Sequence, residues 1–162
     1  MKKLASTLAI FCIFAGVFAQ KNLTPAQQSF QTSIVNFLRE EGYSPSINDN
    51  NRVIVFKSEG KNHYISIYKE SPFFVTIEVS GFTLQGEDAF ERTASLLACN
   101  DLNKNIEVVK LYCGSNEEGV NVQVEQYFRS IQDFKYVFAK NLSALTSAKK
   151  QFYEKYTANG GQ

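Results

Sequence analysis

The stretch from Arg52 to Ser80 constrains the fold more than any other part of the chain. It contains three runs rich in β-branched and aromatic residues, at about residues 52–58, 63–68 and 73–80. Runs of this length and composition are typical of β-strands. Because only short turn signals separate them, the stretch predicts a three-stranded antiparallel meander.

Both turns of this meander are marked by residues that suit a reversal of the chain. Glu59–Asn62 forms the first turn, and Gly60 within it can adopt a positive φ without a Cβ clash. Glu70–Pro72 forms the second turn, and Pro72 has no amide proton to donate to a strand ladder. Neighbouring strands are therefore expected to pair directly.

Side chains alternate along these strands in a way that distinguishes the two faces of the sheet. In the second strand Ile65 and Ile67 fall on one face, and Tyr64 and Tyr68 fall on the other. In the third strand Phe74 shares the tyrosine face. We expect helices to cover the apolar face, and the semi-polar face to meet water or a partner. Tyr64, Tyr68 and Phe74 are therefore the candidate partner-binding residues.

Sequence signals predict a helix before the meander. Thr24 is placed as its N-cap, Pro25 as its first residue, and Gln27 as the third residue of a capping box. Phe30, Ile34, Phe37 and Leu38 form its apolar stripe, and Gly42 is expected at its C-terminal end.

Two more helices and two more strands follow the meander. A helix is predicted over about residues 87–103, with Phe90, Ala94 and Leu97 as its buried stripe. Strands are predicted at about 107–113 and 119–128, and a long amphipathic helix begins after Ser130. The order is α-β-β-β-α-β-β-α, which predicts the α+β class: an antiparallel sheet with helices packed on one face.

The first nineteen residues have the pattern of a secretory signal peptide. Lys2 and Lys3 precede an apolar run, and Val17-Phe18-Ala19 provides small residues at the −3 and −1 positions before Gln20. The run is shorter than the ~20 residues that a membrane-spanning helix needs. We therefore expect an exported chain, periplasmic or extracellular, with no membrane span after cleavage. Residues 20–157 would form one α+β domain, and 158–162 a disordered tail.

Charge and cysteine content limit the classes of function. The chain has 17 basic and 16 acidic residues, so it lacks the basic excess that nucleic-acid binding requires. Cys99 and Cys113 remain after signal cleavage, and a disulfide between them is one reading for an exported chain. We favour buried free thiols, because one cysteine falls on a helix and the other near a strand end.

No cluster of residues with catalytic or metal-binding character emerges from the sequence. His63 is the only histidine, and it falls in a strand beside a hairpin. A cysteine–histidine pair of Cys113 with His63 is the one enzymatic alternative, although nothing local activates either residue. We therefore expect a non-enzymatic protein without cofactor or metal.

The order of elements and several short segments resemble the bacterial YbjN family, whose domains are similar in fold to type III secretion chaperones. The segments are FLREEGYSPSI (37–47), FKSEGKNHYISI (56–67), ACNDLNKN (98–105) and VVKLY (108–112), followed by the 130–153 helix. The resemblance implies a small α+β module that binds other polypeptides or itself, so a homodimer is expected on this basis alone. It implies no catalytic residues.

Two functions are left open by the sequence. The leading hypothesis is an exported, non-enzymatic protein-binding module acting in the bacterial envelope through the semi-polar sheet face. The alternative is a carrier of a small apolar ligand, with a pocket between the sheet and the last helix.

Overall fold

The computed structural model describes residues 23–48, 52–70, 72–82, 89–113 and 119–161. In chain order the elements are α1 (Pro25–Glu40), β1 (Ser46–Ile47), β2 (Val53–Ser58), β3 (Lys61–Lys69), β4 (Phe73–Phe82), α2 (Ala89–Asn105), β5 (Val109–Cys113), β6 (Val120–Phe128) and α3 (Ile131–Ala158). The predicted signal peptide, residues 1–19, lies outside the described residues. No helix within the described ranges has both the length and the hydropathy needed to cross a membrane.

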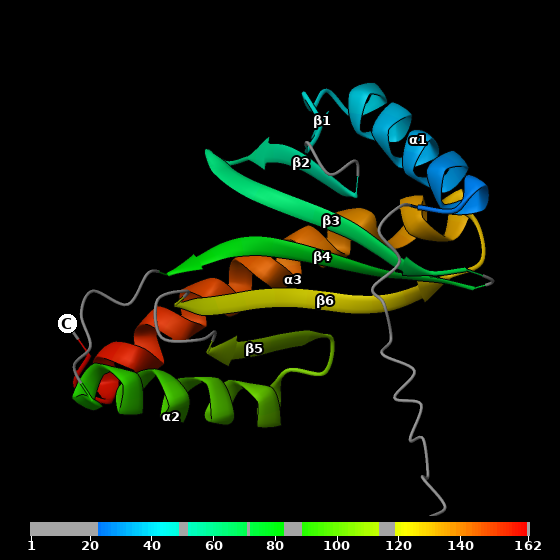
Figure 1. Ribbon diagram of the computed structural model, residues 1–162. Coiled ribbons are helices and arrows are strands. Elements are labelled where there is room, and N and C mark those ends of the chain that lie inside the picture. The colour runs from blue at the N-terminus through cyan, green and yellow to red at the C-terminus, as the bar shows by residue number, and fades with distance from the viewer. Residues whose placement is uncertain (1–22, 49–51, 71, 83–88, 114–118, 162) are drawn as a thin grey trace, which may run out of the picture.

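All strands form one antiparallel sheet in the order β1-β2-β3-β4-β6-β5 (Figure 1). The α+β class and the antiparallel sheet are thus confirmed, and so is the meander, as β2, β3 and β4. The sequence did not predict that β4 pairs with β6 rather than with β5. In the later hairpin, β6 therefore lies inside the sheet between β4 and β5, and β5 forms the edge.

The structure adds one strand to the predicted order. Ser46 pairs with Val55 and Ile47 with Ile54, which makes β1 a two-residue edge strand. The sequence around it reads as turn chemistry, because a strand of two residues is too short to show alternation. Asn48 then turns the chain into β2, since its side-chain oxygen accepts hydrogen bonds from the backbone amides of Arg52 and Val53.

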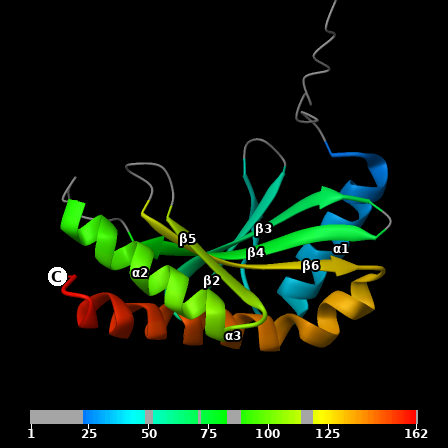
Figure 2. The same cartoon turned by 90° about the horizontal axis from the view of Figure 1, so that it is seen from below.

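The three helices pack against a single face of the sheet. Figure 2 shows α3 running beneath the strands, with α1 and α2 towards opposite ends. Most apolar strand residues on this face are at most 4% exposed: Ile54, Phe56, Ile65, Ile67, Val75, Ile77, Val79, Val109, Leu111, Val120, Val122, Val124 and Phe128. Phe134, Phe138, Leu145 and Phe152 of α3 are buried against them. Removing this apolar area from water is the main stabilising contribution to the fold.

The ends of α1 are as predicted. Thr24 and Gln27 form the capping box, because each side chain bonds the backbone amide of the other. Gly42 has a φ of 85°, and the Tyr43 amide donates to the Leu38 carbonyl. This is the hydrogen-bond pattern of a Schellman motif. In α3, the Ser130 side chain accepts from the Asp133 amide as its N-cap.

The predicted buried stripe of α2 is wrong for two of its three residues. Phe90 is 59% exposed and Leu97 is 52% exposed, whereas Ala94 is buried as expected. Ala98 and Leu102 continue the observed buried side, which also includes Ser95 and Cys99. Alanines allow α2 to approach β5 and α3 closely, so the small residues rather than the large ones face inwards.

The C-terminal segment is more closely packed than the tail predicted for residues 158–162. Helix α3 continues to Ala158, and the amide of Gly161 donates to the Tyr156 carbonyl at 3.0 Å. Gly161 is buried against the Tyr156 ring. Of this segment, only residue 162 lies outside the described residues.

The β2–β3 hairpin turns through two residues with positive φ. Glu59 has a φ of 51° and Gly60 a φ of 75°, and the flanking Ser58 and Lys61 are paired. Two positive φ values are the mark of a type I′ turn, which matches the twist of the flanking strands. Gly60 adopts this conformation freely, as predicted, but Glu59 adopts it at a cost in free energy.

Replacing Glu59 with Asn should therefore stabilise the protein. Asn tolerates positive φ and is preferred before Gly in this turn, so Glu59→Asn should raise the free energy of unfolding by about 0.5–1 kcal/mol. Urea denaturation measures the change. Glu107→Asn makes the same chemical change at an exposed residue whose φ is not positive, and it should give no comparable gain. Equal effects of the two substitutions would show that the turn conformation is not the cause.

Candidate partner-binding face

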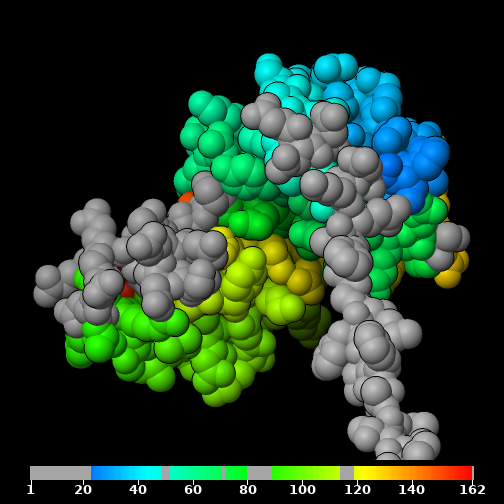
Figure 3. Space-filling model, in the orientation of Figure 1, coloured from blue at the N-terminus to red at the C-terminus, as the bar shows by residue number. Residues whose placement is uncertain are grey.

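The face of the sheet opposite α3 is not covered by a described helix (Figure 2). In Figure 3, which views the molecule from this side, the α1 atoms lie at upper right and the α2 atoms at lower left, with sheet residues between them. Antiparallel pairing aligns the side chains of this open face in rows that cross the strands.

Aromatic side chains gather at one end of the open face. The Tyr68 and Phe74 ring centroids are 6.0 Å apart, and those of Phe74 and Tyr127 are 4.9 Å apart. Tyr68 is 55% exposed and Tyr127 59% exposed, with the half-buried Phe74 between them. We call these three residues the aromatic cluster. Two of the three candidate residues are therefore neighbours, and Tyr127 joins them from β6.

Tyr64, the third candidate residue, lies apart from the aromatic cluster. It shares β3 with Tyr68 but is four residues away, a distance of about 13 Å along a strand. It is half-buried and pairs with Val55 on one side and Glu78 on the other. Tyr64 therefore belongs to the centre of the open face.

Glu78 brings a carboxyl group to the centre of the open face. Its neighbours across the strands are Tyr64 and Gln123. Burial raises the pKa of the Glu78 carboxyl above its ordinary value, because the charged form loses hydration. A cation brought against this carboxylate would replace part of that lost hydration.

The other carboxylate of the open face is already paired. Glu125 lies 3.3 Å from Lys110 on β5 and also accepts a hydrogen bond from Gln123. The pair is exposed enough that it contributes little to stability. It does mean that Glu78, rather than Glu125, is the carboxylate available to a partner.

Helix α2 closes the edge of the sheet at β5. The Asn103 side chain donates to the Leu111 carbonyl at 2.8 Å, and its oxygen accepts from the Leu111 amide at 2.9 Å. Both backbone groups that Leu111 presents away from β6 are therefore satisfied. An edge strand with its hydrogen-bonding groups occupied cannot accept an added strand at that point.

The cysteine–histidine pair of the enzymatic alternative is not assembled. Strands β4 and β6 lie between β3, which carries His63, and β5, which carries Cys113. Three strand spacings separate the two residues by about 14 Å, far beyond hydrogen-bonding distance. Within the described ranges, no three His, Cys, Asp or Glu side chains cluster as metal ligands.

His63 is a buried residue of the helix-covered face. It is 3% exposed, its ring stacks on Phe56 with centroids 5.1 Å apart, and Nδ1 lies 3.2 Å from the Lys61 carbonyl oxygen. Burial lowers the pKa of its imidazole, and the positive charge of Lys149 lowers it further. The hydrogen bond to Lys61 acts in the opposite direction.

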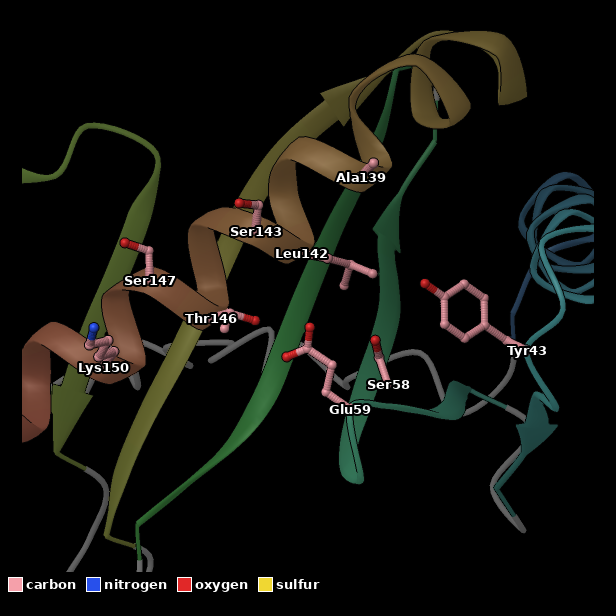
Figure 4. A pocket seen from close by; sticks show the side chains of 9 residues that line it. All are labelled: Tyr43, Ser58, Glu59, Ala139, Leu142, Ser143, Thr146, Ser147 and Lys150. Atoms are coloured by element: carbon pink, nitrogen blue, oxygen red, sulfur yellow. The ribbon is translucent and has the colours of Figure 1, made fainter.

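A groove of about 500 Å³ runs beside α3, between this helix and the β2–β3 turn (Figure 4). Seven of its nine lining residues carry a hydroxyl or charged group: Tyr43, Ser58, Glu59, Ser143, Thr146, Ser147 and Lys150, beside Ala139 and Leu142. In Figure 4 the Glu59 carboxylate and the Thr146 hydroxyl face each other across it. The space between the sheet and α3 is filled by buried side chains such as Phe134 and Phe152. The space expected to hold an apolar ligand is therefore occupied by side chains of the core.

Comparison of the chain with protein-family models, with curated proteins and with solved structures yields no match.

The depressed pKa of His63 predicts how stability depends on pH. As pH falls below 6.5, the unfolded chain takes up a proton at this histidine that the folded protein does not. The free energy of unfolding should therefore decrease as pH falls from 7.5 to 5.5, since stability rises with pH wherever the unfolded state binds more protons. Urea titrations at several pH values measure this slope.

His63→Asn provides the matched variant, because its amide nitrogen can still donate to the Lys61 carbonyl but does not titrate. The variant should lose stability at all pH values and show a shallower slope between pH 7.5 and 5.5. The raised pKa of Glu78 acts in the opposite direction near its own range, and it is common to both proteins. Parallel pH profiles of wild type and variant would contradict the assignment.

Proposed function

We propose that this chain is an exported, non-enzymatic protein-binding module whose open sheet face holds a segment of another protein. The observation that carries the proposal is the aromatic cluster, Tyr68, Phe74 and Tyr127, on a face that no described helix covers. Tyrosine is suited to such a surface, because a large ring gives contact area and the hydroxyl keeps a polar tip.

The chemistry of the open face favours a partner segment that carries an apolar anchor and a basic residue. The anchor would pack on the aromatic cluster, where it removes exposed rings from water. The basic residue would pair with Glu78, about 13 Å away along the strand, since Glu78 is four residues from Phe74. Glu125 already pairs with Lys110 and offers less to a partner.

The β5 edge of the sheet is blocked by α2. This favours binding of the partner on the sheet face over addition of a peptide strand at β5. Asn103 satisfies both free backbone groups of Leu111, so an extended peptide finds no ladder to continue there. The side chains of the face then supply both affinity and specificity.

The resemblance to YbjN proteins supports polypeptide binding in general terms. The pattern of residues 1–19 supports export to the bacterial envelope or beyond. A small apolar ligand is the weaker alternative, since the interior under the sheet is filled and most residues that line the groove beside α3 carry hydroxyl or charged groups.

Site-specific photo-crosslinking tests this proposal. A photoreactive phenylalanine analogue at position 127 should cross-link a protein in envelope extract of the source cells, and mass spectrometry should place the cross-link near an apolar residue with a lysine or arginine close by. Tyr136 of α3, which is 79% exposed, is the matched control position. A probe there should give no such product.

Affinity measurements with the purified partner then show how much each residue of the face contributes to binding. Tyr68→Ala with Tyr127→Ala should weaken Kd by at least about tenfold, as expected for aromatic hot spots, and Tyr136→Ala should leave it unchanged. Glu78→Gln should weaken binding and reduce its dependence on salt. Equal cross-linking at 127 and 136, or equal affinity of all variants, would overturn the assignment of the face.

A further inference from the structure

We propose that Cys99 and Cys113 form an intramolecular disulfide that fastens α2 to the edge strand β5. The structure shows both as thiols, with their side chains hydrogen-bonded to each other. One belongs to a helix and the other to the end of a strand, so the bond would join two different elements of secondary structure.

The packing of α2 on β5 places the two cysteines opposite each other. The helix and the strand run antiparallel and are joined by a short connection (Figure 1). Asn103 fixes their relative position through its two hydrogen bonds to Leu111. One helical turn back from Asn103, about 6 Å, leads to Cys99. Two residues on from Leu111, about 7 Å, lead to Cys113. Because these two distances are similar and run in the same direction from the Asn103–Leu111 contact, Cys99 and Cys113 lie beside each other.

Burial and side-chain direction agree with this placement. Cys99 is 5% exposed and lies on the inward side of α2 with Ala98 and Leu102. Cys113 is partly exposed and shares the inward face of β5 with Val109 and Leu111. Both belong to or pack against the same apolar core. The two side chains are therefore directed into the same interior.

The reaction is thiol–disulfide exchange with an external disulfide, such as oxidised glutathione. The Cys113 thiolate attacks one sulfur of the oxidant, forms a mixed disulfide and releases one glutathione thiolate. The Cys99 thiolate then attacks the Cys113 sulfur and releases the second. Two protein thiols are oxidised and one external disulfide is reduced, and the two thiol protons pass to the released glutathione or to solvent.

The environment of the two thiols sets this order of steps. Burial, the nearby Cys113 and the hydrogen bond between them raise the pKa of the Cys99 thiol to about 12. A thiol with such a pKa is a poor first nucleophile at neutral pH, and Cys113 is also the more exposed of the two. Once Cys113 is a mixed disulfide, its charge and hydrogen bond no longer disfavour the Cys99 thiolate. The second step is thereby made easier by the first.

Oxidation of the purified full chain tests the proposal. Under oxidised glutathione, mass spectrometry should show the loss of two hydrogens and a peptide pair that links Cys99 to Cys113. Because the bond closes a loop of about fifteen residues, Tm should rise by roughly 5–10 °C. A reductant should reverse both changes. Before oxidation, a thiol reagent should modify Cys113 of the folded protein much faster than Cys99.

Cys99→Ser and Cys113→Ser are the matched variants, and neither should gain thermal stability on oxidation. If a variant does not fold, the linkage map of the wild-type chain still decides the question. Disulfide-linked dimers, a glutathione adduct that stays on Cys113, or no oxidation at all would each overturn the proposal. If Cys99 and Cys113 are found linked but Tm does not rise, the inference that the bond stabilises the packing of α2 on β5 is wrong. None of these readouts depends on the partner-binding face.

Discussion

The alternation of side chains along β3, β4 and β6 is the constraint on which the rest of the structure depends. In these strands the residues that face α3 are mainly apolar, with His63 and Gln126 as polar exceptions, and the residues between them are aromatic, polar or acidic. A shift of one residue in any pairing would exchange the two sets. The register Ile65–Ile77–Val124 is therefore held by the burial of its own side chains.

The helices are arranged to bury that one apolar face. Helix α3 covers it along its length, and α1 joins α3 at one end through contacts between rings. Phe30 stacks on Phe73 of the sheet with centroids 4.1 Å apart, and Phe37 meets Phe138 of α3 edge to face at 5.2 Å. Helix α2 closes the other end through small side chains and the Asn103 contact with β5. The three described helices therefore lie on one side of the sheet, and none of them covers the opposite face.

Much of this fold follows from local signals in the sequence. The capping residues Thr24 and Ser130, the Gly60 turn and the strand alternation each depend on neighbours in the chain, and each was predicted correctly. Non-local features were missed. The pairing of β4 with β6 across an intervening helix and strand leaves no mark in the sequence, and neither does the two-residue β1.

The same distinction explains the candidate site. Tyr68 and Phe74 were found because they are close in the chain and lie on one face of a predicted hairpin. Tyr127 joins them only through the β4–β6 pairing, which was not predicted. The inward side of α2 was misjudged because large apolar residues were favoured over the alanines that permit close packing.

Hydroxyl-radical footprinting of the purified protein, read out by mass spectrometry, measures most directly whether one side of the sheet is open. If it is, Tyr68 and Tyr127 should be oxidised at rates comparable to that of the exposed Tyr136, while Phe56 and Phe134 on the covered side are protected. Protection of Tyr68 and Tyr127 in the monomer, to the level of the buried phenylalanines, would contradict an open face.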